Sequence, residues 1–431
     1  MNKKWFGLER ILLLSNDSFI KNIFVLITGT ASVQVLNFAL TPLITRLYSA
    51  EEFGALGLFS SILSLLIVIS ALSYPIAIVF VKEEQKYKRL VSISLKLMLI
   101  TGAALFLLSL LSLNLFVFSF NDILWYLFLG FFPASITAIY SQILLRNKKF
   151  KTIAYIGFSS AIAVATTKII SGLYYPSSTS LILSAILGFL VSLTAMHFVI
   201  FGKSIKFEIP VFNIRERLLM RELQQFPLYR LPHSFNAALS QIVPVTLLTS
   251  YFGLKAAGYF VLTRSVLMVP VTLLGKAVYD VAYPKISADF GNKPITKFLI
   301  YSTCGLLGIS LIPLLILLFW GQELFSLIFG HDWSRAGLYA SCMSFWFVFN
   351  VSNRPSVAAV SFLGLDKLLL INGVISLSLS TLGFLVAYYV WGTDTAAISA
   401  FFLCAIFLQV FLISNVLIAS GKSDKSLSTI N

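Results

Sequence analysis

The chain has 431 residues, of which 58% are hydrophobic and 11% are charged, and its formal net charge is +15. A soluble domain has about a quarter of its residues charged, so this composition indicates an integral membrane protein. The apolar runs are continuous over about 20 residues, whereas the strands of an outer-membrane barrel alternate apolar and polar residues over about ten. The expected fold class is therefore an all-α polytopic membrane protein.

Twelve apolar segments of membrane-spanning length follow one another along the chain, in two groups of six. The longest polar stretch, KSIKFEIPVFNIRERLLMRELQQF, separates the groups. The predicted spans cover residues 22–45, 53–81, 91–118, 123–145, 152–172, 179–202, 228–251, 257–283, 297–319, 336–363, 369–390 and 395–419. We therefore expect an amphipathic cytoplasmic N-terminus without a cleavable signal peptide at 1–21, a six-helix bundle at 22–202, a cytoplasmic linker at 203–227, a second six-helix bundle at 228–419 and a cytoplasmic tail at 420–431.

The distribution of lysine and arginine predicts the orientation, because basic residues near helix ends resist translocation. With both termini in the cytoplasm, most basic residues of the connecting segments lie inside, against Arg46, Lys255 and Arg335 outside. This topology, together with attraction to anionic lipid headgroups, explains the positive charge. Nucleic acid is therefore not an expected partner, whereas membrane lipids are.

Several functional classes lack their sequence signals. The chain contains no phosphate-binding glycine loop of the form GxxxxGK[ST], which argues against transport driven by ATP hydrolysis within this chain. Cys304, Cys342 and Cys404 lie in predicted spans without close spacing or a neighbouring histidine, so no metal site is expected. No cofactor is expected either. The longest predicted outer connection, WGQELFSLIFGHDWSRAG, provides only one short amphipathic helix.

The two halves contain similar segments, as expected for a transporter built from an internal repeat. The first span with its exit reads SVQVLNFALTPLITRLYSAEEFGALGLFSSIL, and the seventh reads FNAALSQIVPVTLLTSYFGLKAAGYFVLTRSVL. Each has a proline, a short charged turn and a glycine next to an aromatic residue, which are Phe53 and Gly54 in one case and Gly258 and Tyr259 in the other. The spacing differs by about two residues. The pattern favours a duplication of six helices.

The segment GTASVQVLNFALTPLITRLYSAEEFGALGLFSSILSLL resembles the N-terminal signature of polysaccharide-biosynthesis membrane proteins, the O-antigen and capsule repeat-unit flippases of the Wzx type. In that pattern a helix ends in P-L-[IL]-[TS]-R-[LF]-Y, followed by an acidic pair and F-G. Here these positions are Pro42 to Tyr48, Glu51 and Glu52, and Phe53 and Gly54, with Ala50 where many relatives have proline. The segments FPLYRLPHSFNAALSQIVPVTLLTSYFGLKAAGYF and VPVTLLGKAVYDVAYPKIS are similar to the region of helices 7 and 8 in the same group.

This resemblance implies the fold of the multidrug/oligosaccharidyl-lipid/polysaccharide exporter superfamily, with two pseudo-symmetric six-helix bundles around a central cavity. It implies an undecaprenyl-diphosphate-linked oligosaccharide as substrate, moved from the inner to the outer leaflet of a bacterial cytoplasmic membrane. Other polysaccharide assembly proteins are further expected partners. A transporter of this kind is not an enzyme.

Such a substrate needs cations in a wet, protein-lined cavity, because a diphosphate that loses its water must gain other partners. Apart from Arg230 and Lys297 at the ends of their spans, the charged residues in the predicted spans are five basic residues and one acidic residue: Lys96, Lys168, Arg264, Lys276, Arg354 and Asp280. Arg264 lies about seven residues inside its span and has no carboxylate within one helical turn. We therefore expect Arg264 to face the cavity and contact the diphosphate.

Each of the other charges has an ordinary structural interpretation beside the functional one. Lys96 is close enough to the inner end of its helix to reach the headgroups. Lys168 fits a snorkelling residue and a cavity residue equally well. The polar run NVSNRPS around Arg354 predicts local unwinding towards water. Lys276 and Asp280 are four residues apart and predict a structural or coupling ion pair.

Arg46, at the outer end of the first span, is the remaining candidate. It either contacts the substrate or anchors the helix by pairing with Glu51 or Glu52. The predicted substrate-binding residues are thus Arg264, Arg46, Arg354 and Lys168.

Two other functions are weighed against the flippase. A cation-coupled multidrug exporter of the same fold needs acidic residues in the first bundle, and the first six predicted spans contain none. A polytopic glycan polymerase is expected to have a large outer loop, and the outer loop around His331 and Arg335 is short. Coupling to a proton or sodium gradient and downhill movement both remain open as the energy source.

Overall fold

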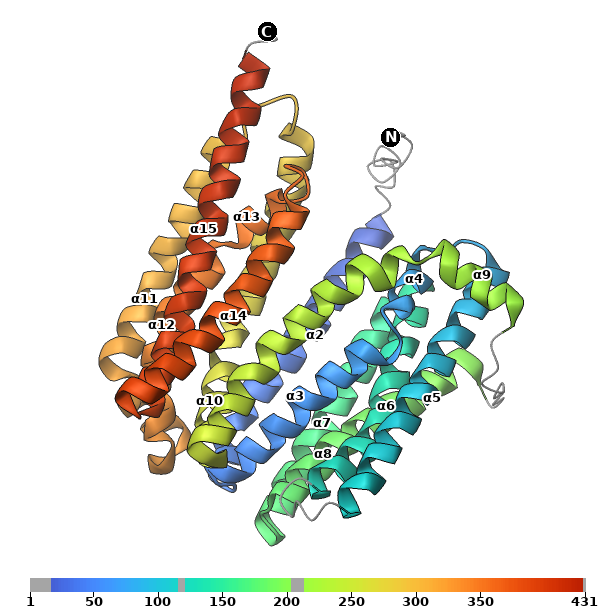
Figure 1. Cartoon of the computed structure of the whole chain (residues 1–431), viewed down its shortest axis with the longest axis vertical. Coiled ribbons are helices and arrows are strands. Elements are labelled where there is room, and N and C mark those ends of the chain that lie inside the picture. Colours follow the sequence, from blue (N-terminus) through green and yellow to red (C-terminus); the bar gives the residue numbers. More distant parts are fainter. Residues whose placement is uncertain (1–16, 115–120, 203–212, 429–431) are drawn as a thin grey trace. The chain divides into compact units, whose positions relative to one another are not determined.

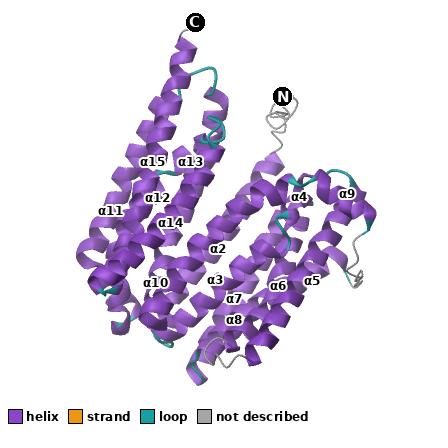
Figure 2. Ribbon diagram, in the orientation of Figure 1, coloured by secondary structure: helices purple, strands orange, loops and turns teal. Residues whose placement is uncertain are grey.

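The computed structural model describes residues 17–114, 121–202 and 213–428. These residues fold almost entirely into helices joined by short turns (Figure 2). The expected N-terminal surface helix lies largely outside the described residues, as does the first part of the linker. The helices have the following bounds: α2 Asp17–Thr45, α3 Ala50–Ser70, α4 Tyr74–Phe80, α5 Glu84–Asn114, α6 Asn121–Arg146, α7 Phe150–Tyr174, α8 Ser178–Phe201, α9 Ile214–Glu222, η2 Phe226–Arg230, α10 Leu231–Asp289, α11 Thr296–Phe329, η3 His331–Trp333, α12 Ser334–Ser352, α13 Arg354–Ala359, α14 Asp366–Trp391 and α15 Asp394–Ser428.

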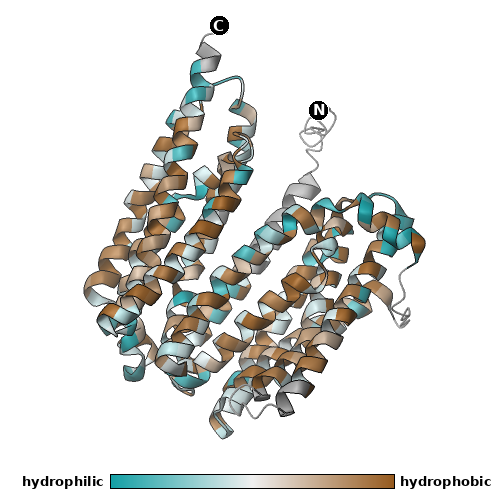
Figure 3. Cartoon of the chain, viewed as in Figure 1, coloured by the Kyte–Doolittle hydropathy of each residue, from teal (hydrophilic) through white to brown (hydrophobic). Residues whose placement is uncertain are grey.

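The twelve predicted spans correspond to these helices, and the chain is a multi-pass membrane protein. In the part of the chain that the structure describes, nine helical stretches are long and apolar enough to cross a membrane. One of them, Phe226–Gly275, has 50 residues, which at 1.5 Å per residue is roughly 75 Å and enough for two crossings. Helix α2 and the pair α12 and α13 supply the remaining two. Apolar residues cover the long helices, whereas polar residues gather at α9 (Figure 3).

Glycine and proline divide the predicted spans where the backbone cannot continue as a regular helix. Spans 7 and 8 form the single helix α10, which is interrupted at Gly253, with φ 83° and ψ 172°. The span predicted at 53–81 is divided into α3 and α4, and Leu72 and Ser73 have positive φ just before Pro75. Pro75 lies in the first turn of α4, where its missing N–H needs no partner, so it fits the start of a new helix after this break.

The chain divides into two compact units. The first contains residues 1–40, 66–170 and 183–231, and the second contains residues 41–65, 171–182 and 232–431. In the first unit α4, α5 and α6 pack together and α9 contacts α5 (Figure 1). In the second unit α11 packs along α12, and α15 packs along α12 and α14. The expected domain boundaries at residues 202, 228 and 419 remain a prediction.

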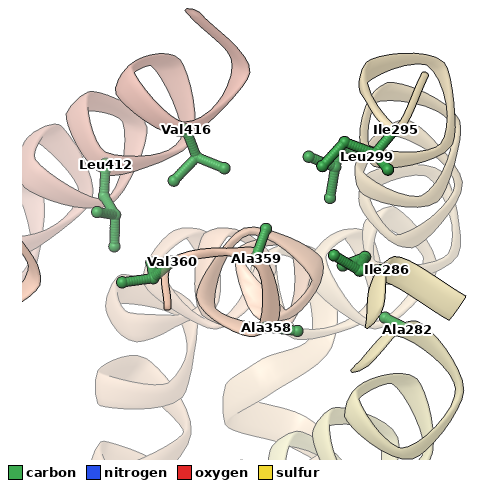
Figure 4. Packing of buried hydrophobic residues seen from close by; sticks show 9 residues of the cluster. All are labelled: Ala282, Ile286, Ile295, Leu299, Ala358, Ala359, Val360, Leu412 and Val416. Atoms are coloured by element: carbon green, nitrogen blue, oxygen red, sulfur yellow. The ribbon is translucent and has the colours of Figure 1, made fainter. Parts of the chain in front are cut away.

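A buried apolar cluster holds together the end of the second unit where α10, α11, α13 and α15 meet. Its members point towards one another from these four elements, and they are Ala282, Ile286, Ile295, Leu299, Ala358, Ala359, Val360, Leu412 and Val416 (Figure 4). Next to the cluster, the carboxylate of Asp424 on α15 accepts hydrogen bonds from the backbone N–H groups of Ile295 and Thr296, each 3.0 Å long. This carboxylate satisfies free donors at the start of α11.

Candidate functional site: unpaired arginines and a glycine crossing

Arg264 lies on the second segment of α10, after the break at Gly253. Its Nη1 donates a 3.3 Å hydrogen bond to the backbone oxygen of Gln241 on the first segment. The side chain is partly exposed, and none of the carboxylates that the structure describes comes within 4 Å of it. A guanidinium has five N–H donors, so most of its capacity for hydrogen bonding is left for another partner.

Arg354 lies at a helix break that the sequence predicts. Helix α12 ends at Ser352 and α13 begins at Arg354, with Asn353 between them. The guanidinium donates through Nη2 to the side-chain oxygen of Asn350. Its Nε is buried and has no hydrogen-bond partner among the described residues, and the same is true of the side-chain oxygen of Asn353.

A glycine on α10 makes room for the Arg354 side chain. A Cβ atom at Gly275 would lie 3.0 Å from Nε and 3.2 Å from Cδ of Arg354. Gly275 is eleven residues after Arg264 on α10, which is roughly 16 Å further along the helix. The two arginines therefore lie at different depths along α10.

Arg46 is exposed in the turn between α2 and α3. The alternative role as an anchor paired with an acid is not found, because neither Glu51 nor Glu52 comes within 4 Å of it. Glu52 instead accepts a 2.6 Å hydrogen bond from the backbone N–H of Ser49, and the Ser49 hydroxyl accepts one from the N–H of Glu52. These reciprocal bonds cap the start of α3, so the acid has a structural role.

The other charged residues selected from the sequence are Lys168, Lys276 and Asp280, and the structure does not show any of them as an isolated charge. Lys168 is on α7, is only partly exposed and has an interaction partner, so it is not an isolated charge. Lys276 and Asp280 lie on α10, but their side chains are outside the described residues, and their pairing remains a prediction.

The interpretation of Lys96 as a snorkelling residue is wrong. Lys96 is 6% exposed, and its Nζ lies 2.9 Å from both carboxylate oxygens of Glu216 on α9. Sequence reasoning missed this pair because Glu216 is 120 positions away in a polar linker. Other basic residues of the spans and turns are also paired with acids: Lys86 with Glu83 and Glu222, Arg146 with Glu84, and Arg335 with Asp394.

Gly54 and Gly258, the glycines of the two similar sequence segments, meet where α3 crosses α10. A Cβ atom added to Gly54 would overlap the backbone oxygen of Leu254 and lie 3.1 Å from the nitrogen of Gly258. A Cβ atom added to Gly258 would overlap the oxygen of Ala50 and lie 3.0 Å from the nitrogen of Gly54. The crossing is therefore reciprocal, and only glycine allows the two backbones to approach this closely.

Two buried hydrogen bonds connect the end of α2 to the end of α11 and to Trp333 in the same region. The Thr45 hydroxyl at the end of α2 donates a 3.0 Å bond to the backbone oxygen of Phe329 at the end of α11. The indole N–H of Trp333, which is 1% exposed, donates a 2.9 Å bond to the backbone oxygen of Thr45. Each helix end thus receives a hydrogen bond that its own helix cannot supply. Nothing in the sequence indicated Trp333 for this role.

Comparison with protein families identifies the chain. A family described as polysaccharide biosynthesis protein matches residues 43–337, well over half of the sequence. The chain belongs to this family. A search of curated proteins gives no match.

Solved structures show the same fold at low sequence identity. An inward-facing multidrug resistance MATE transporter of the MOP superfamily is 12% identical, with a TM-score of 0.69 over 92% of this chain and 96% of that chain. The lipid II flippase MurJ in an inward closed conformation is 15% identical, with a TM-score of 0.64 over 94% and 91%. A MOP-superfamily transporter from Pyrococcus furiosus, described by the reverse polarity of its binding pocket, is 12% identical, with a TM-score of 0.57 over 95% and 96%. The fold is thus the twelve-helix fold expected from the sequence.

Proposed function

We propose that this protein is a flippase for undecaprenyl-diphosphate-linked oligosaccharide repeat units. It moves them from the cytoplasmic to the outer leaflet of a bacterial cytoplasmic membrane by alternating access through a cationic cavity. Both chain termini lie in the cytoplasm. This proposal makes the protein a transporter and not an enzyme.

The observation that carries this proposal is the contrast between two groups of basic residues. Lys96, Lys86, Arg146 and Arg335 each lie within 4 Å of a described carboxylate, but Arg264 and Arg354 do not. A buried or half-buried charge without an opposite charge is costly, and it persists where a ligand supplies the missing partner. Arginine suits a diphosphate because its planar guanidinium can donate two parallel hydrogen bonds to phosphate oxygens.

Within this proposal the four predicted residues have different tasks. Arg264 is the principal diphosphate ligand, because a single bond to Gln241 leaves its other donors available. Arg354 is a second ligand at a different depth along α10, so a diphosphate passes from one cation to the other. Arg46 is exposed at the end of α2 and receives the diphosphate where it leaves the protein. Lys168 contributes positive charge from α7.

Within this proposal the glycine crossing is the candidate contact for closing the outer side. The predicted topology puts the α2–α3 turn on that side, which supports this role for the reciprocal contact of Gly54 and Gly258 and for the bonds of Thr45 and Trp333. Export requires these contacts to separate. The energy source is a proton or sodium gradient, or the consumption of the sugar chain outside, and Lys276 and Asp280 are the candidate coupling pair.

The test is leaflet-specific detection of lipid-linked oligosaccharide in cells whose only copy of the protein carries Arg264→Ala. We expect the intermediate to accumulate on the cytoplasmic face while the variant is inserted at normal levels. The matched control is Lys148→Ala, which removes an exposed positive charge from a turn between α6 and α7 and is expected to leave export unchanged. Normal export by the Arg264→Ala variant would remove Arg264 from the proposed path.

A further inference from the structure

Helix α9 is attached to the first unit by polar contacts. The carboxylate of Glu216, which is 5% exposed, pairs with Lys96 and also accepts a 3.0 Å hydrogen bond from the backbone N–H of Asn213. One turn further, the Tyr74 hydroxyl donates to the backbone oxygen of Met220. Leu219 is buried on the same side of the helix. These contacts fix the rotation of α9 about its own axis.

The opposite side of α9 is exposed and combines apolar and basic residues. Ile214 is 73% exposed and Leu218 is 59% exposed, and they are four residues apart on one face. Arg217 and Arg221 lie next to them and are also exposed. Neither arginine has a carboxylate within 4 Å in the part of the chain that the structure describes. The helix thus buries an ion pair against the protein and presents apolar side chains away from it.

The position of α9 along the chain places it near the membrane boundary. The membrane-spanning helix α8 ends at Phe201, and the next spanning stretch begins at Phe226, four residues after α9 ends. Exposed apolar residues continue into this stretch, with Leu228 60% and Tyr229 75% exposed. An amphipathic helix with arginine beside its apolar face is suited to the headgroup region of an anionic bilayer.

We propose that the face of α9 formed by Ile214, Arg217, Leu218 and Arg221 binds anionic phospholipid at the membrane surface. The apolar side chains enter the boundary between headgroups and acyl chains, and the two guanidinium groups bind lipid phosphates. The buried Lys96–Glu216 pair fixes the rotation of α9 so that this face is directed towards the lipid. This site is separate from the proposed transport path and does not depend on the substrate.

The test uses the purified full-length protein in detergent, titrated with phosphatidylglycerol or phosphatidylcholine, and native mass spectrometry to count bound lipids. We expect the double variant Arg217→Gln/Arg221→Gln to bind phosphatidylglycerol roughly 25-fold more weakly, because each basic residue near an anionic surface contributes about a fivefold change. Binding of phosphatidylcholine should change much less. The matched control is Lys293→Gln/Lys297→Gln, which removes two exposed charges, one from the turn between α10 and α11 and one from the first turn of α11.

Two further variants test separately the apolar contact with lipid and the fixed rotation of α9. Ile214→Ser/Leu218→Ser should weaken binding of both lipids, because it removes the apolar contact. Glu216→Gln should weaken phosphatidylglycerol binding although it makes the protein more positive, since it releases the helix from its fixed rotation. Unchanged phosphatidylglycerol binding in the arginine variant, or an equal loss in the lysine control, would overturn the proposal. Equal affinity of the unaltered protein for the two lipids would also overturn it.

Discussion

The crossing of α3 and α10 predicts a large effect from adding a single methyl group. In Gly258→Ala the new Cβ would lie 2.6 Å from the carbonyl carbon of Ala50 and would overlap its oxygen. Carbon atoms in contact prefer separations of about 3.5–4.0 Å, so the two backbones must move apart by at least about 1 Å. The displaced atoms belong to helix backbone, which cannot rotate away as a side chain can. Forcing extra volume into a packed contact costs about 1–3 kcal/mol, and we expect a loss of this size.

The assay is thermal denaturation of the purified variant in detergent, compared with Gly308→Ala on α11. Gly308 is also in a helix, but a Cβ atom there would meet nothing within 4 Å. The control should be neutral or slightly more stable, because alanine is favoured over glycine in helices by up to about 1 kcal/mol. We also expect Gly54→Ala to behave like Gly258→Ala, because the contact is reciprocal. If Gly258→Ala were as stable as Gly308→Ala, the close crossing would not exist.

The remaining predictions concern the buried ion pair and the position of Arg354. Replacing Lys96 with methionine should destabilise the protein by about 3 kcal/mol, because Glu216 then remains buried without its partner. The double variant Lys96→Met/Glu216→Met should recover much of this stability, and thermal denaturation measures both effects. Burial on its own raises the pKa of Glu216, but hydrogen bonds from Lys96 and the linker backbone outweigh it and hold the pKa below its usual value. This stabilisation is complete above about pH 4.5 and is lost as the pH falls through the lower folded pKa. Helix α9 should therefore gain protease sensitivity only in acid, and a sensitivity that does not change with pH would contradict the assignment. Gly275→Ala should displace the Arg354 guanidinium, and we expect it to reduce export severalfold with little change in thermal stability. Unchanged export would argue against a substrate role for Arg354.

Hydropathy alone was sufficient to locate the spans, because a bilayer requires long uninterrupted apolar segments. The breaks were partly predictable, since Pro355 and the polar residues around it indicated the separation of α12 and α13. The continuous path of α10 through Gly253 was not predictable from composition. The short polar segment between predicted spans 7 and 8 is compatible both with a separate loop and with one bent helix. Only the backbone geometry at Gly253 distinguishes the two.

The candidate site was predictable in its residue types but not in its contacts. Arg264 and Arg354 could be selected because they interrupt apolar segments without a nearby acid. The partner of Lys96 could not be found, because sequence spacing reveals pairs within a helix and not pairs joined by the fold. Gly54 and Gly258 were identified as equivalent positions of a repeat, but nothing in the sequence showed that the two positions touch.

The affinity of purified protein for undecaprenyl-diphosphate-linked oligosaccharide tests the role of Arg264 without the complications of cellular export, when it is measured for the unaltered chain and for Arg264→Gln. We expect at least a tenfold loss of affinity in the variant, because a charge-assisted hydrogen bond to phosphate contributes about 1.5–3 kcal/mol. The control Lys148→Gln should bind as tightly as the unaltered chain. Equal affinity in all three proteins would contradict the claim that an unpaired arginine of α10 holds the diphosphate.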